Sequence, residues 1–530
     1  MEDIEMSRRY KNGVDRSQGL LLPPRVEEYV GEDNPVRAID AYAESLDLEG
    51  LGFKHAAGSL SAGRPSYAPQ ALLKLYLYGY LMRIRSSRLL ERETHRNLEL
   101  IWLLEGLRPS HATIADFRKH NAKALKAANR DFVMLRKELD LYGGELAAID
   151  GSFFRGNVAK ENIYTASRLQ KLLARIEKDI DHYHQALEAA DKAGGAADNA
   201  GLAEKLVALK ARQARHQKQL ATLEKSGETQ YAEVDKDARL LTKNAQRVAG
   251  YNVQLAVDAK HKLLIHCEVT GDGNDTGQLA PMAQAAKATL GVETLDVAAD
   301  AGYYNQVHLK ACLDNGITPY VPAPRHPSDQ EDKGRLPRSR FVFEADSNRY
   351  RCPEGQRLLF DRRIDKQGKI VLHYRSDRQV CAGCPRRERC LPKKTPYREI
   401  YRWEHEALAE AHDRRMAEAG AAYMKRRAGM AEHPFGTLKR WCGWDHFLVR
   451  GKTKVSGEMN LLMLCYNFKR VLRLLGLEKF RDCLAQRARQ SPQAIEHRAA
   501  GASLRLLSSL SDLLADLFSI LIRSLPQRCA

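Results

Sequence analysis

The stretches GGELAAIDGS at 143–152 and VETLDVAADAGYYN at 292–305 decide the fold, because each ends a short apolar run of strand type with an acidic residue. These residues are Asp150 and Asp300. A third acid, Glu432, lies within AGMAEHPFGTLKR, a helical stretch rich in Lys and Arg. Carboxylates rarely stand at the ends of core strands unless a metal ion or a catalytic proton needs them. The three segments therefore predict one shared site.

The charge of the chain indicates what such a site acts on. The 530 residues include 85 Lys and Arg against 67 Asp and Glu, a formal net charge of +18. Such a balance favours a polyanionic partner, most often nucleic acid, although a merely basic enzyme would carry the same charge. The length suggests roughly three to four domains. We therefore expect the acids to hold divalent cations against a phosphodiester.

The sequence gives little sign of secretion or of membrane insertion. The N-terminal MEDIEMSRRYKNG lacks the apolar core of a secretory signal. The apolar stretch 503–525 carries Arg505, Asp512, Asp516 and Arg523, which argues against a membrane span and predicts an amphipathic helix. Ten cysteines are too few for a disulfide scaffold. A cytoplasmic protein is expected.

Alternating strand and helix patterns predict an α/β core. GYNVQLAVD and HKLLIHCEVTGDG predict an antiparallel strand pair, and TGQLAPMAQAAKATLG predicts a helix ending at Gly291. Two charged amphipathic stretches predict an inserted helical hairpin. The expected order is a lead-in at 1–60, a helical DNA-binding domain at 61–135, the first part of the core at 140–325 with the hairpin at 165–226, a four-cysteine insertion at 340–400, the second part of the core at 403–476 with the helix of Glu432, and a tail at 485–530.

Several short helical patterns between Ser66 and Asn121 suit a helix-turn-helix-like DNA-binding module. The last of them contains Arg118 and Lys119, which are candidates for contact with DNA. The alternative is an ordinary helical bundle with a solvated basic face.

Four cysteines lie close together in the sequence of the predicted insertion. A C-x2-C pair with two further cysteines matches tetrahedral thiolate zinc. Reduced thiols without metal are the main alternative, and redox catalysis is a third. The candidate zinc ligands are Cys352, Cys381, Cys384 and Cys390.

The three acids have a clear chemical use. Mg²⁺ prefers oxygen ligands and typically takes one or two carboxylates together with water and phosphate oxygens. Two such ions about 4 Å apart can activate an attacking oxygen and stabilise a leaving one. Three acids among 67 form a weak pattern by themselves. Competing candidates for the same role are Asp258, Asp272 and Asp275.

In combination the motifs resemble the DDE transposases of bacterial insertion sequences. The matching pieces include IDGSFFRGNVAKEN around Asp150, GYNVQLAVD at 250–258 and ADAGYYN around Asp300. The likeness spans about residues 60–475. It ends in a block that follows the family's Y…R…E…K signature with Tyr423, Arg426, Glu432 and Lys439.

One spacing departs from the family. Six residues separate Glu432 from Lys439, as the family has it, whereas the five between Arg426 and Glu432 are more than expected. Arg427 is therefore a rival for the role of the arginine. Beside a catalytic Glu, the residues Tyr423, Arg426, Arg427 and Lys439 are expected to bind DNA by gripping phosphate, with a solvated basic helix as the alternative.

The resemblance implies a ribonuclease-H-like catalytic core. It implies that Asp150 bridges two Mg²⁺ or Mn²⁺ ions, that Asp300 completes one metal site and that Glu432 completes the other. Activated water would cut the 3′ strand at each transposon end, and the freed 3′-hydroxyl would attack target DNA. The implied partners are transposon ends, target DNA and a second copy of the chain, with no membrane. A related nuclease without strand transfer and a catalytically inactive DNA-binding regulator stay open as alternatives.

Overall fold

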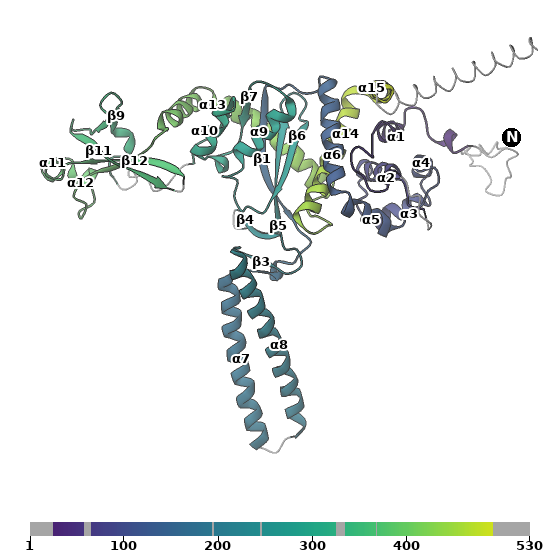
Figure 1. Cartoon of the computed structure of the whole chain (residues 1–530), viewed down its shortest axis with the longest axis horizontal. Coiled ribbons are helices and arrows are strands. Elements are labelled where there is room, and N and C mark those ends of the chain that lie inside the picture. The colour runs from purple at the N-terminus through teal and green to yellow at the C-terminus, as the bar shows by residue number, and fades with distance from the viewer. Residues whose placement is uncertain are drawn as a thin grey trace, which may run out of the picture. The chain divides into compact units, whose positions relative to one another are not determined.

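The computed structural model describes residues 25–57, 65–192, 196–243, 246–324, 334–366 and 368–490 (Figure 1). The chain divides into two compact units, Met1–Phe117 with Val471–Ala530, and Arg118–Arg470. The amphipathic helix predicted at 503–525 lies outside the described residues. None of the described helices is long and apolar enough to cross a membrane.

The first unit is helical. Ser86 and Asn97 cap two of its helices by accepting hydrogen bonds from the N–H groups of Leu89 and Glu99, and Pro69 begins a third. Within the range 1–60, where a lead-in was predicted, the structure has the helix α1, which buries its apolar side chains. The elements of this unit are η1 (Val26–Tyr29), α1 (Val36–Glu44), α2 (Pro69–Leu81), α3 (Ser87–Thr94), α4 (Leu98–Leu103), the greater part of α5 (His111–His120), and α15 (Leu477–Gln490).

A six-stranded sheet forms the centre of the second unit. Its order is β4-β5-β1-β7-β8, with β6 also paired to β5. The pairs β1–β7 and β7–β8 are parallel, whereas β4, β5 and β6 are antiparallel to their neighbours. The strands are β1 (Leu146–Arg155), β4 (Arg239–Lys243), β5 (Gln246–Asp258), β6 (Leu264–Thr270), β7 (Leu295–Ala298) and β8 (Ile317–Tyr320).

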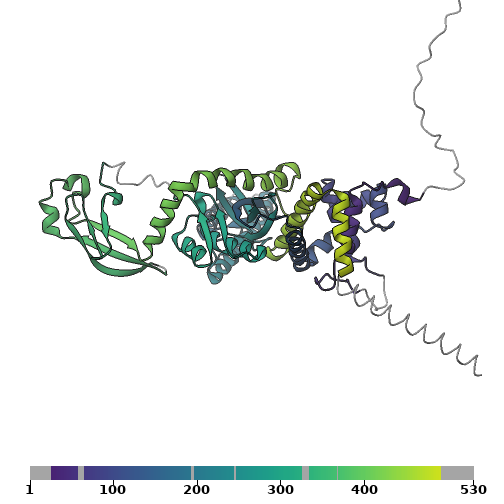
Figure 2. The ribbon, with the colours of Figure 1, turned by 90° about the horizontal axis from the view of Figure 1, so that it is seen from above.

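Helices pack on this sheet. The long helix α13 (Glu406–Gly436) contacts β1, β5, β7 and β8, and Figure 2 shows it running along the sheet. The predicted helix α9 (Leu279–Leu290) ends at Gly291, whose φ of 64° places it in the left-handed region. The predicted antiparallel strand pair is β5–β6. The helix α10 (Gln306–Asp314) joins β7 to β8.

One boundary differs from the prediction. The helix α6 (Ala122–Glu138) was expected to belong largely to the N-terminal domain, but it lies in the second unit. It packs on α14 (Lys452–Leu475), where the Asn129 amide donates to Asn460 Oδ1 at 3.0 Å and the rings of Phe132 and Phe468 are 6.0 Å apart. Sequence-distant packing therefore overrides the boundary that sequence order suggested.

Two insertions leave this core. The helices α7 (Ala166–Lys192) and α8 (Ala196–Ser226) run side by side as the predicted hairpin (Figure 1), and the short pair β2 (Ile163–Tyr164) and β3 (Tyr231–Ala232) joins its two ends. The second insertion is a five-stranded antiparallel sheet of order β13-β12-β11-β10-β9. Its elements are η4 (Arg338–Arg340), β9 (Val342–Glu344), β10 (Arg349–Arg351), β11 (Arg357–Lys366), β12 (Lys369–Ser376), α11 (Arg378–Ala382), α12 (Arg387–Cys390) and β13 (Glu399–Trp403).

The close approach of β1 and β5 requires glycine at one position. A Cβ at Gly250 would lie 2.0 Å from the carbonyl oxygen of Phe154, which no real contact allows. Gly250→Ala should lower the free energy of unfolding by about 1–3 kcal/mol because the strands must separate. Denaturant melts would measure this loss. The control is Gly273→Ala, where nothing lies within 4 Å of the added Cβ and no loss is expected. Equal stability of the two variants would contradict this close approach of β1 to β5.

Candidate active site

Asp150 and Asp300 follow two neighbouring parallel strands in matching register. The strands β1 and β7 form three consecutive pairs that end at Ala148↔Ala298. Each acid therefore stands two residues beyond the last pair and on the same face, and adjacent strands lie about 4.8 Å apart. The strand pairing brings both carboxylates to one end of the β1–β7 ladder. One expectation is corrected: β1 continues to Arg155, so Asp150 lies just beyond the pairing with β7 but within the strand and not at its end.

Backbone groups hold both carboxylates. Oδ1 of Asp150 accepts a hydrogen bond from the N–H of Gly151 at 2.9 Å. Oδ1 of Asp300 accepts from the N–H of Gly302 at 2.8 Å and so caps the short helix η3 (Ala301–Tyr303). The next residue of β1 thus helps to set the direction of the Asp150 side chain, and the turn that follows Asp300 sets the direction of the Asp300 side chain.

The helix α13 brings an arginine to Asp150. Arg427 Nη1 lies 3.8 Å from Asp150 Oδ1, and both side chains are less than one-fifth exposed. Arg426 instead lies over the ring of Tyr423, 6.0 Å from its centroid. Of the two arginines that the sequence left as rivals, the structure therefore places Arg427 at the acid.

Tyr423 fastens the same helix to the sheet. Its hydroxyl donates to Asp296 Oδ2 at 2.5 Å, and its ring stacks on Tyr320 with centroids 3.5 Å apart. The hydrogen bond with Asp296 raises the pKa of Tyr423 well above its ordinary value. Tyr423 was proposed from the sequence to contact DNA; in the structure its hydroxyl binds β7.

Lys439 reaches β1 from the π-helical turn η5 (Thr437–Trp441). Its Nζ donates to Ser152 Oγ and to the carbonyl oxygen of Phe153, both at 2.6 Å. It also lies 4.4 Å from the centroid of the Phe154 ring. The lysine therefore holds the segment just beyond Asp150 against the end of α13.

Glu432 lies on α13 between the two residues that reach β1, Arg427 and Lys439, and its side chain is exposed. The structure thus places it on the helix that covers Asp150. Across the ranges that the structure describes, no group of three or more His, Cys, Asp or Glu side chains stands close enough to hold a metal ion. The register of β1 and β7 brings Asp150 and Asp300 together, whereas the exposed Glu432 does not join them.

The competing acids have different surroundings. Asp258 is buried, and its carboxylate accepts hydrogen bonds from the N–H groups of Gly143 and Gly144, so it holds the segment that leads into β1. Asp272 is exposed and accepts from the Gln278 amide at 2.6 Å. Asp275 is buried.

Three polar residues at the site were missed from the sequence: Asn252, Gln254 and Tyr303. The first two are hydrogen-bonded to Asp275, and Tyr303 is bonded to Gln254. Burial, followed by the charges of Asp275, Asp150 and Asp300, raises the pKa of Tyr303 well above its usual range. The available signal was two polar residues at alternate positions of the otherwise apolar run GYNVQLAVD.

The two basic residues predicted to contact DNA, Arg118 and Lys119, differ in their exposure to solvent. Arg118 is 7% exposed, with Nη1 3.7 Å from Glu458 Oε1. Lys119 is exposed. As placed, Lys119 could meet a large partner directly, whereas Arg118 faces the protein interior.

The four cysteines lie on the turn after β10 and in or beside the short helices α11 and α12. Cys352 and Cys390 pack against its core, and Cys381 Sγ lies 3.0 Å from Ser376 Oγ. Burial raises the pKa of the Cys390 thiol, and the neighbouring thiols of Cys381, Cys384 and Cys352 raise it further. All four are free thiols. In the part of the chain that the structure describes, they do not stand close enough together to hold a metal ion.

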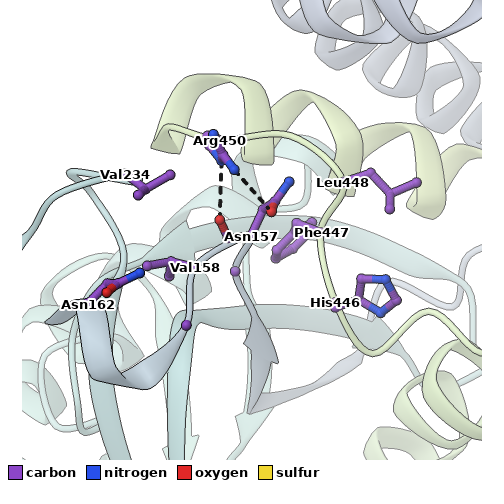
Figure 3. A pocket seen from close by; sticks show the side chains of 10 residues that line it. Asn157, Val158, Asn162, Val234, His446, Phe447, Leu448 and Arg450 are labelled. Atoms are coloured by element: carbon purple, nitrogen blue, oxygen red, sulfur yellow. Dashed lines mark hydrogen bonds between the residues drawn. The ribbon is translucent and has the colours of Figure 1, made fainter.

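A pocket of about 400 Å³ lies beyond the end of β1 (Figure 3). The guanidinium of Arg450 crosses it to Asn157, whose carbonyl oxygen accepts at 3.2 Å. His446 and Phe447 also line it, and the Phe447 N–H donates to the carbonyl oxygen of Arg155. Its lining contains no acidic side chain, so it is separate from the carboxylate site.

Comparison with known proteins identifies the family. The model described as "Transposase DDE domain" matches residues 146–468, and that described as "Transposase domain (DUF772)" matches residues 24–120. Among solved structures, the cryo-EM structure of the piggyBac transposase synaptic complex with hairpin DNA is 10% identical, with 87% of this chain and 80% of that chain covered and a TM-score of 0.30. That similarity is too low to carry an argument, and no curated protein matches. Because the DDE model covers more than half of the chain, and all of the candidate acids, the chain belongs to the DDE transposases of insertion-sequence type.

Proposed function

We propose that this transposase cuts and joins DNA with divalent metal ions held by Asp150, Asp300 and Glu432. The observation that carries the proposal is the register of β1 and β7, which delivers two carboxylates to one end of neighbouring parallel strands. Carboxylate oxygens are the ligands that Mg²⁺ and Mn²⁺ prefer, so the donor set fits these ions. The exposed side chain of Glu432 would turn toward the pair to complete the set.

The metal ions, when bound, would activate the attacking oxygen and stabilise the leaving oxygen at the scissile phosphate. The residues of the chain orient the metal ligands and neutralise part of their charge. Arg427 sets a positive charge beside Asp150, and Lys439 fixes the strand segment that follows it. Tyr423 holds α13, and therefore Glu432, over β7. Cleavage at each transposon end would free a 3′-hydroxyl, which attacks target DNA.

The sheet supports a ribonuclease-H-like core. Read as β6-β5-β1-β7-β8, it is antiparallel on one side of β1 and parallel on the other. DNA is the partner of the enzyme, and two ends must be brought together, so we propose a homodimer in the DNA complex. The hairpin α7–α8 is a candidate contact for it. Nothing in the family matches favours a nuclease without strand transfer or an inactive regulator.

Removing any one of the three carboxylates should abolish catalysis. Asp150→Asn, Asp300→Asn and Glu432→Gln should each lower strand cleavage by about 1,000-fold or more, because the ions lose a ligand at the reacting phosphate. Cleavage and strand transfer of labelled DNA carrying the element's ends would be measured with Mg²⁺, and binding of the same DNA by mobility shift should persist. Asp272→Asn, on an exposed side chain, is the matched control. Normal cutting by any of the three variants would remove that residue from the site.

The two arginines of α13 should differ. Arg427→Ala should lower the cleavage rate by about 10–100-fold, since Asp150 loses the cation that orients it. Arg426→Ala removes a side chain that lies over Tyr423 and should affect DNA affinity more than the rate. Single-turnover cleavage at saturating enzyme separates rate from affinity. A larger loss of rate in Arg426→Ala would reverse the assignment.

We further propose that the four-cysteine unit binds a structural zinc ion. Two thiols come from one turn, in which the Cys384 N–H donates to the Cys381 carbonyl, and the other two pack on the same sheet core. Purified protein should contain about one zinc per chain, and Cys381→Ser should release it. Metal analysis by mass spectrometry is the measurement, with Cys483→Ser on α15 as the control that keeps its zinc. A fully folded wild-type protein without zinc would end this proposal.

A further inference from the structure

A buried polar network lies behind Asp150 and next to the turn that follows Asp300. Asn252 and Gln254 occupy alternate positions of β5, and Gln254 pairs with Gly151, the residue after Asp150. Both amide side chains are buried, and so are Tyr303 and Asp275. Since Gly151 and Asp150 point to opposite faces of β1, the network supports the strand from the face away from α13. Polar groups buried together in this way are costly unless hydrogen bonds satisfy them.

Asp275 is the centre of this network. Its Oδ1 accepts from Asn252 Nδ2 at 2.8 Å and from Gln254 Nε2 at 2.7 Å. The hydroxyl of Tyr303 donates to Gln254 Oε1. A continuous path of hydrogen bonds therefore runs from Asp275 to the turn that follows Asp300.

The absence of a side chain at Gly151 lets Asp275 approach β1, and Gly302 shows how near Asp275 lies to Asp300. A Cβ at Gly151 would lie 2.7 Å from Asp275 Oδ1 and 2.3 Å from Gln254 Nε2, so only glycine fits there. A Cβ at Gly302 would lie 3.9 Å from Asp275 Oδ2 and 2.9 Å from Asp300 Oδ1, so both carboxylates come within 4 Å of one point. Asp275 thus touches the residue that follows Asp150 and stands beside the Asp300 carboxylate.

We infer that Asp275 is a positioning residue of the metal site, which holds the strand residue after Asp150 and the turn after Asp300 and adds negative charge behind them. The inference rests on the proposed function. A carboxylate this close to Asp300 raises the electrostatic cost of an empty site, because like charges repel, and a divalent cation relieves that cost. Residues that orient metal ligands from behind commonly change metal affinity when they are replaced.

The experiment uses the full chain and Mn²⁺ alone as the probe. Asp275→Asn keeps the shape and the Oδ1 acceptor but removes the charge, and it should weaken Mn²⁺ binding by about tenfold or more. Free Mn²⁺ measured by electron paramagnetic resonance gives the affinity without DNA or catalysis, and Asp275→Glu, which restores the charge, should recover part of it. Asp272→Asn, in the same loop but exposed, should bind as wild type does.

Thermal unfolding without metal distinguishes positioning from folding. A purely structural role would lower the melting temperature of Asp275→Asn and leave the Mn²⁺ affinity of the folded protein unchanged, and that result would overturn the inference. If the amide disturbs packing, Asp275→Ser removes the charge while leaving room for water. The Mn²⁺ concentration for half-maximal cleavage should rise in parallel with the weaker binding.

The variant Asp150→Asn separates this inference from the proposed function. Loss of Mn²⁺ binding in Asp150→Asn, with unchanged binding in Asp275→Asn, would overturn the role of Asp275 alone. A wild-type chain that binds no Mn²⁺ would overturn the proposed metal site, and the inference with it. Weaker binding in both variants supports the two together.

Discussion

The parallel pairing of β1 with β7 sets the position of the rest of the site. Parallel strands put their carboxyl ends at the same edge, so two acids in equivalent register arrive side by side without contact between distant loops. The register also sets the face. Asp296, two residues before Ala298, meets Tyr423 of α13, and Asp150 meets Arg427 of the same helix. Asp150 of β1 and Asp296 of β7 therefore both face α13. A slip of one residue in the register of either strand would turn that acid to the opposite face of the sheet.

Carboxylates that converge must be stabilised before any cation arrives. Here the compensation is local: backbone N–H groups bind Asp150 and Asp300, and the Arg427 guanidinium stands near the first of them. Neutral amides rather than ammonium groups donate to Asp275 from β5. This arrangement leaves negative potential at the strand ends for a divalent ion, whereas the positive charge of the chain as a whole favours DNA.

Much of this could be predicted from the sequence, and the failures have physical causes. Apolar runs before Asp150 and Asp300 are local patterns, and so is the glycine that ends α9, so these two strands and this helix were predictable, although β1 runs on beyond Asp150. Which arginine faces Asp150 depends on the rotation of α13 about its axis, and that is set by the contact of Tyr423 with β7 and β8. The role of α6 depends on Asn460 and Phe468, more than 300 residues away in the chain. The polar network around Asp275 was hidden because Asn252 and Gln254 acquire a partner only when β5 folds against the loop after β6.

The distance in sequence between the acids explains why α13 needs several anchors. The five-stranded insertion separates β8 from α13, so chain connectivity alone does not fix the helix on the sheet. Three contacts supply that restraint: Tyr423 on Asp296, Arg427 near Asp150, and Lys439 on the backbone of Phe153. Contacts spaced along one helix determine both its axial position and its rotation, and Glu432 lies between the last two. In the metal site that we propose, the conformational freedom left to Glu432 is then that of its own side chain, so a bound cation would have rotamers to order instead of a helix.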